Sequence, residues 1–566
     1  MESREVVYRA LTEAGARTLR QVELSYTEGY QTYTVLHAYT LKKDGTRVDV
    51  PREGVMHGFG VTSTPGFQDL KTISVVFPNV EVGDEVALTT VFGQTRPWFG
   101  QSYTEDFIYG RSIAASDVSI GLTAPSDMHL QVEANGLTEQ APETLGGKTR
   151  RIWHYQNHTP IDPEDDQVDD YDSGARLVVS TFKDFREFAG VYSNMLSDRT
   201  EVTPEIRQLA DSLTAGLKSD TEKARVLYDW VSVHIAYLDI VLGAGGFVPH
   251  KASEVLANKY GDCKDHVILL QALLAAKGIR STPVLINAED RFTLSPSPSP
   301  LAFNHLISYV PSLQLYLDST ARYAPFGVLP YSDASKPVVR IEDGATVRTP
   351  RVAAAGASVR AVSNLTVAPD GTIDGDTQIV AMGAPAADLR ALMTAANAAG
   401  QDIYIHKAMG PGVEARVDLG NINDLSPTYR YSAHYHEPNA LNVPGPATIP
   451  FNVAYKPFSF TGLVAGDLPG KREKSYVCRS MDSEEDLTIH LPANLHVMVL
   501  PRAQNLATDE MGMTMVYSKP DPATVHADIK VHVDHPSGAC TPEYYARVHA
   551  SITQMTTALR AQILYQ

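Results

Sequence analysis

The sequence has few cysteines, no long apolar run and no excess of positive charge. Its 566 residues include three cysteines, so disulfides cannot be the main support of the fold. No run approaches the roughly eighteen apolar residues of a membrane-spanning helix. Acidic residues outnumber basic ones by 66 to 48, and this balance argues against nucleic acid and anionic membranes as partners. No glycine-rich phosphate loop and no internal repeat is visible.

What the sequence contains is typical of a soluble protein with several domains. Hydrophobic residues make up 43% of the chain and charged residues 20%. The length favours three domains. Strand-like segments with turn signals predominate in 1–195, helices and strands mix in 196–345, and strands return in 346–566 before a final helix. The predicted fold is therefore multidomain α+β, with β-rich N- and C-terminal domains around an α+β core.

One stretch near the middle of the chain has the pattern of a nucleophile. Residues 260–266 are YGDCKDH, and apolar residues then recur at helical spacing until Lys277 and Gly278, a last-turn cation and a helix-ending glycine. This pattern predicts a buried helix with Cys263 in its first turn. Backbone N–H groups and the positive end of the helix dipole favour the nucleophilic thiolate there. A cysteine that serves only as a small buried hydrophobe is the alternative.

A histidine and an aspartate further along are predicted to meet across a β-hairpin. Residues 303–310 and 313–318 resemble strands, and a turn signal lies between them at Pro311. A two-residue turn would place His305 directly opposite Asp318, and a longer turn would make them diagonal neighbours that can still touch. A helix-start cysteine followed by such a pair supplies the nucleophile, base and orienting group of thiol acyl chemistry.

Together these stretches resemble the Cys-His-Asp core of the transglutaminase-like superfamily, which has a papain-like fold. The resemblance is carried by GDCKDH at 261–266, FNH at 303–305 and LYLDST at 315–320. It extends upstream through residues 243–250, 252–256 and 224–231. More narrowly, the chain is similar to bacterial proteins in which a β-rich domain of unknown function precedes such a core.

The resemblance implies a role for each of three residues. The family's nucleophile falls on Cys263, its base on His305 and its orienting carboxylate on Asp318. The expected substrate is a peptide, protein or other amide, attacked to give a thioester, with no cofactor. Water as the second reactant makes the enzyme a peptidase or amidase, which we favour, and an amine makes it a transglutaminase. A non-catalytic binding or scaffold protein with a vestigial site is a further alternative, because the flanking β-rich parts make up most of the chain.

The cellular location and the two remaining cysteines are interpreted together. The first residues, Met1–Glu5, lack the apolar segment of a signal peptide. Because the resembled family is commonly exported, we expect a periplasmic or secreted protein whose signal peptide has been removed, with a cytoplasmic protein as the alternative. Cys478 and Cys540 could form a disulfide or could be two buried thiols. Nothing in the sequence fixes an oligomeric state.

Two further segments attract functional hypotheses. The acidic run at 162–172 has the residue types of a calcium site, but its spacing does not fit an EF-hand. We therefore predict a solvated linker and no metal. The proline- and serine-rich segment 288–301 cannot form regular structure. It is either an inert insertion or a rim of the substrate groove, and shortening it is expected to leave folding largely intact.

Overall fold

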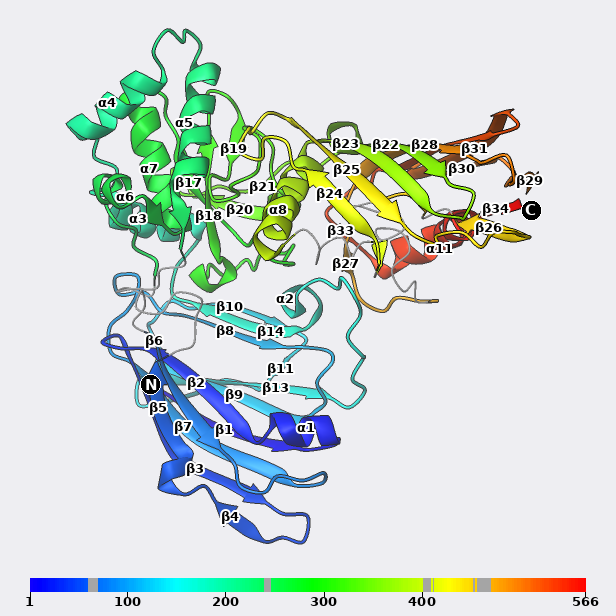
Figure 1. The fold of residues 1–566 in the computed structure, drawn as a ribbon. Helices are drawn as coiled ribbons and strands as arrows, with labels where there is room; N and C mark the ends of the chain where they lie inside the picture. The colour runs from blue at the N-terminus through cyan, green and yellow to red at the C-terminus, as the bar shows by residue number, and fades with distance from the viewer. Residues whose placement is uncertain (60–69, 239–245, 401–408, 411, 451–452, 456–469) are drawn as a thin grey trace. The chain divides into compact units, whose positions relative to one another are not determined.

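The computed structural model describes residues 1–59, 70–238, 246–400, 409–410, 412–450, 453–455 and 470–566 (Figure 1). The chain divides into two compact units. Unit 1 comprises residues 1–103, 190–201 and 235–269, and unit 2 comprises 104–189, 202–234 and 270–566. The predicted multidomain α+β fold is confirmed. Its predicted division into 1–195, 196–345 and 346–566 stays a prediction.

Unit 1 contains an antiparallel β-sandwich. One sheet has the order β1-β7-β3-β4 and the other β2-β6-β5. Ile73 and Val75 of β6 share one core with Val86 and Leu88 of β7, because alternate residues of each strand face inward. The bounds are β1 Glu2–Arg9, α1 Glu13–Thr18, β2 Gln21–Thr27, β3 Gln31–Leu41, β4 Arg47–Asp49, β5 Val55–Phe59, β6 Leu70–Val76 and β7 Glu85–Gln94.

The rest of unit 1 leads to the predicted nucleophile. The strands β15 (Ala236–Tyr237) and β16 (Tyr260–Gly261) pair in parallel, and α6 (Ala252–Asn258) lies between them in the chain. Directly after β16 begins α7 (Cys263–Ala276), whose residues up to Leu269 belong to this unit. As predicted, the helix is buried and is followed by Gly278 in the left-handed region (φ 74°).

Unit 2 begins with a second β-sandwich. Its sheets have the orders β10-β14-β8 and β11-β13-β12, and β9 also pairs with β13. Trp153, Leu177, Val179 and Ile120 form the buried core between them. The bounds are β8 Thr104–Tyr109, β9 Ala115–Pro125, β10 Gln131–Asn135, β11 Thr138–Glu139, β12 Glu143–Leu145, β13 Lys148–Asn157, α2 Asp170–Ser173 and β14 Ala175–Ser180.

The α+β part of unit 2 is built on a five-stranded antiparallel sheet. Its order is β19-β18-β17-β20-β21. The predicted helix starts are confirmed: the Thr203 hydroxyl accepts from the N–H of Ile206, and Ser219 and Glu222 bond reciprocally. The bounds are α4 Pro204–Leu213, α5 Asp220–His234, β17 Thr282–Ile286, β18 His305–Val310, β19 Leu315–Leu317, β20 Pro337–Arg340 and β21 Thr346–Arg348. The helix α3 (Phe185–Leu196) begins in unit 2, and its residues from Gly190 on belong to unit 1.

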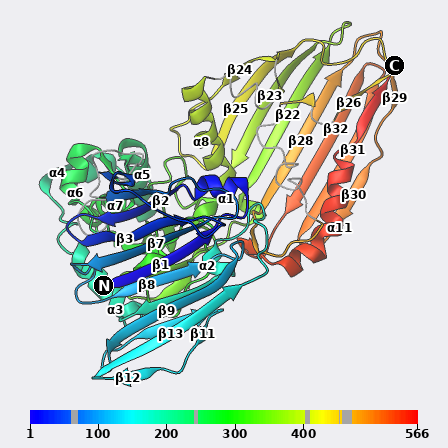
Figure 2. The ribbon, with the colours of Figure 1, turned by 90° about the horizontal axis from the view of Figure 1, so that it is seen from below.

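The C-terminal part of unit 2 is an eight-stranded sheet with helices on one face. The strand order is β24-β25-β23-β22-β28-β32-β31-β30, and Figure 2 shows these strands side by side with α8 at one end and α11 toward the other. Leu389 of α8 (Ala384–Ala399) and Ile552 of α11 (Pro542–Ala558) share the core of the sheet's buried face.

The bounds of the eight strands are β22 Ser358–Val367, β23 Ile373–Met382, β24 Glu414–Asp418, β25 Thr428–Glu437, β28 Met481–His490, β30 Gln504–Ala507, β31 Met511–Asp521 and β32 Thr524–Val533. The predicted terminal helix is α11, and a short strand, β34 (Gln562–Tyr565), follows it because Ile563 and Tyr565 also enter the core. Two small sheets complete the part, with orders β26-β34-β29 and β27-β33; β26 is Ala447–Pro450, β27 Tyr476–Val477, β29 Val497–Val499 and β33 Ala539–Cys540.

The segment 288–301 contains neither helix nor strand before the short 3-10 turn η2 (Pro300–Ala302), but it is anchored rather than loose. Ser295 and Ser299 are buried, and the N–H of Ser295 donates to the Tyr171 hydroxyl. The Asp172 carboxylate accepts the N–H groups of Phe292 and Thr293 and the Thr293 hydroxyl. These contacts argue against the expectation that shortening this segment leaves folding intact, because its backbone groups are bonded to residues of α2.

The same contacts correct the interpretation of the acidic run. Asp169 caps α2 by accepting the N–H of Tyr171, and its carboxylate also faces Arg291 at 3.4 Å. The end of the run is thus an anchor for 288–301 and not a solvated linker. Among the described helices, none is both long and apolar enough to cross a membrane.

Replacing Asp172 by Ala should destabilise unit 2. Three hydrogen bonds to one carboxylate would be lost and two N–H groups of 288–301 left without an acceptor, at a cost of about 2 kcal/mol. We expect a lower thermal midpoint and faster proteolysis within 288–301. The control is Asp162→Ala, an exposed residue of the same run. Equal midpoints for the two variants would contradict the anchoring role.

Candidate active site

His305 and Asp318 lie together at one edge of the five-stranded sheet. His305 is the first residue of β18 and pairs with Ile286 of β17, while Asp318 directly follows β19. His305 Nε2 is 3.1 Å from Asp318 Oδ2, a hydrogen-bonding distance. Both side chains are largely buried, so water screens this pair weakly.

The contact is made in a different register from the simplest prediction. Ser308 pairs with Leu317, whereas a two-residue turn would pair it with Leu315. The turn spans 311–314, with Gln314 in the left-handed region (φ 55°), so Asp318 is a diagonal neighbour of His305. This is the alternative that the sequence left open.

Asp318 is held as an anion. The backbone N–H and hydroxyl of Thr320 both donate to Asp318 Oδ1, at 2.9 and 2.7 Å. Burial opposes the charge, but the imidazole of His305 and these hydrogen bonds hold the pKa of Asp318 well below its ordinary value. The Tyr228 hydroxyl donates to the Asp318 carbonyl at 3.0 Å and fixes the backbone. A carboxylate of this kind orients an imidazole and stabilises its protonated form.

Cys263 lies in the first turn of α7, as predicted, and is buried. Asp262 caps the helix: its Oδ1 accepts the N–H groups of Lys264 and Asp265, at 3.0 and 3.3 Å. Two first-turn donors are thereby taken, and the N–H of Cys263 is not one of them. The Lys264 ammonium forms an ion pair with Asp262, which leaves a cation close to the cysteine.

Asp265 explains the glycine of the motif. Its carboxylate accepts the N–H of His250 at 2.8 Å, contacts the ring Nδ1 of His250 at 3.0 Å and accepts the N–H of Asp262 at 3.2 Å. A Cβ at Gly261 would lie 2.4 Å from the Asp265 Cβ, so no larger residue fits. His250 therefore has an orienting partner, Asp265, which sequence reasoning missed. Through this contact His250 is bonded to the first turn of α7.

The structure thus brings two of the three predicted residues together. His305 and Asp318 are in contact within unit 2, while Cys263 belongs to unit 1, and its approach to His305 is part of the functional proposal below. Of the upstream stretch that carries the resemblance, residues 243–245 lie outside the described residues. Thr320 was missed, although its place two residues after Asp318 is the usual spacing of an Asx turn.

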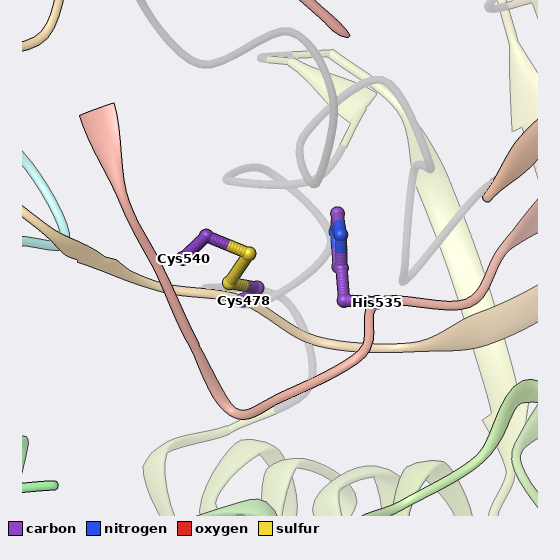
Figure 3. A group of neighbouring side chains, drawn as sticks. All are labelled: Cys478, His535 and Cys540. Atoms are coloured by element: carbon purple, nitrogen blue, oxygen red, sulfur yellow. A yellow bond between two sulfur atoms is a disulfide. The ribbon is translucent and has the colours of Figure 1, made fainter. Parts of the chain in front are cut away.

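Two groups of described side chains offer three potential metal ligands within 4.8 Å of one another. Cys478, His535 and Cys540 form the first, shown in Figure 3, but the two sulfurs are joined in a disulfide with a Cα–Cα distance of 5.9 Å. Burial lowers the pKa of His535 to about 4, and its Nδ1 bonds to the Tyr544 hydroxyl at 2.7 Å. This group is a structural crosslink, and it settles how the two cysteines pair.

The second group is His305, Asp318 and Asp333. His305 Nε2 and Asp318 Oδ2 are bonded directly to each other, and a cation bound to both would break that bond. We assign no metal to it. Asp333 was not singled out by the sequence, because it follows neither a motif nor a strand end.

Comparison with known families identifies the core. Residues 207–307 match the model of the transglutaminase-like superfamily, a range that includes both Cys263 and His305. This core belongs to the transglutaminase-like superfamily. Residues 2–162 match DUF3857, a domain of unknown function with a solved structure. The predicted resemblance, including its β-rich N-terminal domain, is confirmed.

Solved structures support the same fold over the whole chain. A crystal structure of a proposed protease from Parabacteroides distasonis matches with a TM-score of 0.70 and 15% identity, over 100% of this chain and 94% of that chain. A proposed cysteine protease from Cytophaga hutchinsonii covers 39% of this chain and 71% of that one, with 13% identity and a TM-score of 0.19, too low to carry an argument. No curated protein matches the sequence.

Replacing Gly261 by Ala should disturb the helix start of the transglutaminase-like core. The added Cβ must displace Asp265, which holds both His250 and the N–H of Asp262. We expect a lower melting temperature and slower alkylation of Cys263. The control is Gly190→Ala in α3, where a Cβ meets open space and favours the helix by about 0.5–1 kcal/mol. Equal melting temperatures for the two variants would contradict this account of the motif.

Proposed function

We propose that this protein is a cysteine hydrolase that cleaves peptide or carboxamide bonds through a thioester on Cys263. The observation that carries the proposal is the buried His305–Asp318 pair, in a chain whose superfamily match contains both His305 and Cys263. In the proposal the first turn of α7 presents Cys263 to the imidazole. His305 Nε2 is committed to Asp318, so Nδ1 exchanges the proton with the thiol.

The reaction follows from these roles. The Cys263 thiolate attacks the carbonyl carbon, and the resulting oxyanion is met by the Cys263 backbone N–H at the start of α7. The C–N bond breaks as His305 gives its proton to the departing amine, which leaves a thioester. Water then attacks the thioester while His305 takes its proton. The C–S bond breaks, the acid leaves and the thiolate is restored.

Hydrolysis and transfer share every step up to the thioester. An amine can outcompete water only where the site binds and orients it, because water is present everywhere at high concentration. The described residues include no feature that we recognise as an amine site, which favours hydrolysis. Transfer to a lysine or other amine is the outcome that the experiment below would detect.

The disulfide supports an exported protein. Cys478 and Cys540 join β27 to β33 across 62 residues of sequence, and such crosslinks persist mainly in oxidising compartments. A periplasmic or secreted location fits this chemistry better than the cytoplasm. A peptide or protein outside the cytoplasm is then the class of substrate that we propose.

Cys263 should react with iodoacetamide faster than a free thiol at neutral pH, because the helix start and the imidazole both favour the thiolate. It is the protein's only cysteine outside the disulfide, so labelling reports on it alone. His305→Ala should slow the labelling about tenfold or more, since the proton loses its acceptor. The control is His129→Ala, an exposed histidine. Labelling no faster than that of a model thiol would remove Cys263 as nucleophile.

The reaction type is tested with a peptide library in the presence of millimolar primary amine. We expect free acid and new amine termini, with little product that carries the added amine. Cys263→Ala and His305→Ala should reduce cleavage to background, a loss of about a thousandfold or more. Efficient amine incorporation with negligible hydrolysis would make the enzyme a transferase and leave the three residues in their roles. Full activity in Cys263→Ala would refute the proposal.

A further inference from the structure

Asp333 is a third buried side chain beside the His305–Asp318 pair. It ends the 3-10 turn η3 (Tyr331–Asp333), and its exposed fraction is 0%. One of its carboxyl oxygens lies within 4.8 Å of both a ring nitrogen of His305 and a carboxylate oxygen of Asp318. Its backbone is fixed on both sides: its N–H donates to the Pro330 carbonyl, and its carbonyl accepts the Thr349 hydroxyl.

The hydrogen bonds of Asp333 do not suit an anion. Oδ1 accepts the Ser332 hydroxyl at 3.1 Å. Oδ2 is fully buried, and no donor among the described residues reaches it. An ionised carboxylate buried with an unsatisfied oxygen is costly, and a neighbouring carboxylate increases that cost. Burial and the charge of Asp318 accordingly raise the pKa of Asp333 well above its ordinary value.

The other groups near Asp333 do not supply the missing proton. The Tyr228 hydroxyl donates to the backbone carbonyls of Asp318 and Ala324. The Lys336 ammonium donates to carbonyls of the 288–301 segment, those of Glu289 and Arg291, and lies 3.6 Å from the centre of the Phe292 ring. Besides Ser332, the described groups that influence Asp333 are Asp318 and His305. The ionised Asp318 can only accept, and His305 Nε2 is already directed at Asp318 Oδ2.

We propose that Asp333 is a neutral carboxylic acid that donates a hydrogen bond from Oδ2 to the Asp318 carboxylate, and that it is a positioning residue for His305. Its consequence for catalysis rests on the function proposed above. The Asp318 carboxylate would then accept hydrogen bonds from three residues: Thr320 at Oδ1, His305 at Oδ2, and the acid proton of Asp333. The two carboxyl groups occupy opposite protonation states because their surroundings differ.

The bond has a defined effect on the base. A donor to Asp318 withdraws negative charge from it, so the imidazolium of His305 is stabilised less than it would be by Asp318 alone. His305 then returns its proton to the leaving amine more readily. The donor also prevents rotation of the Asp318 carboxylate, and hence fixes the plane in which His305 is held.

The protonation of Asp333 can be measured without any substrate. The infrared difference spectrum of wild type minus Asp333→Asn at neutral pH should contain the carbonyl stretch of a protonated carboxylic acid. Asp127→Asn, in an exposed turn, is the matched control and should give only carboxylate bands. Absence of the acid band from the Asp333 difference overturns the inference whether or not the enzyme is active.

Its effect on His305 is measured from the pH dependence of kcat/KM. Asp333→Asn keeps a donor at the same place and should keep the wild-type profile. Asp333→Ala removes the donor, and we expect the limb set by His305 to move up by about one pH unit, a tenfold change in proton affinity. Asp333→Leu fills the site and should behave like Asp333→Ala, which separates loss of the donor from loss of packing.

The outcomes distinguish this inference from the function. An Asn variant that shifts as far as the Ala variant, or an Ala variant with the wild-type profile, overturns the positioning role while leaving the nucleophile assignment intact. An acid band together with full activity in Cys263→Ala would retain the protonated Asp333 and refute the proposed function. If Asp333→Ala fails to fold, the infrared spectrum and the pH profile of Asp333→Asn still test whether Asp333 is a protonated donor.

Discussion

The buried charge of Asp318 is the interaction on which the rest of this site depends. A carboxylate away from water is tolerated only when it is paired and hydrogen-bonded, and removing one partner of such a pair costs about 3–5 kcal/mol. His305 and Thr320 meet this requirement at the carboxylate, and the Tyr228 hydroxyl fixes the backbone carbonyl of the same residue. A shift in the register of β18 against β17 and β19 is therefore costly, because it would leave the buried Asp318 carboxylate without its partners.

The same constraint gives a reason for the anchored segment 288–301. This segment leads into β18, whose first residue is His305. If the segment were mobile, the position of His305 would be less well fixed. Asp172 and Tyr171 accept backbone N–H groups of the segment, and Lys336 and Arg348 donate to two of its carbonyl groups, at 291 and 292. The β-sandwich of unit 2 thus has a physical role at the site: its side chains fix the approach to the histidine strand. A long irregular segment can be held in one conformation when several of its backbone groups have hydrogen-bond partners.

Sequence reasoning succeeded where the signal is local. The helix starts at Thr203 and Ser219 are set by a side chain and the next three residues, and the start of α7 follows from a glycine, a capping aspartate and apolar spacing. The hairpin pattern predicted the correct partner for His305 but not the register of the two strands. The turn places Gln314 in the left-handed region, and glutamine does not indicate that conformation in a sequence.

What the sequence could not provide depends on partners far along the chain. Asp172 is 121 residues from Thr293, and nothing near either position predicts their bond. The disulfide was one of two open interpretations for the same reason. Asp333 stands in a short turn without a motif, and its unusual state arises only when folding brings Asp318 beside it.

This cluster also bears on the choice between an enzyme and a scaffold. Burying Asp318, Asp333 and His305 together consumes stability, since apolar side chains of similar volume are often as stable or more stable in such places. A protein that acted only through its β-rich surfaces would gain nothing from that cost. Two carboxyl groups in opposite protonation states beside an imidazole have an evident use in tuning a base. The energetics of these three side chains therefore favour catalysis over a purely structural role for the core.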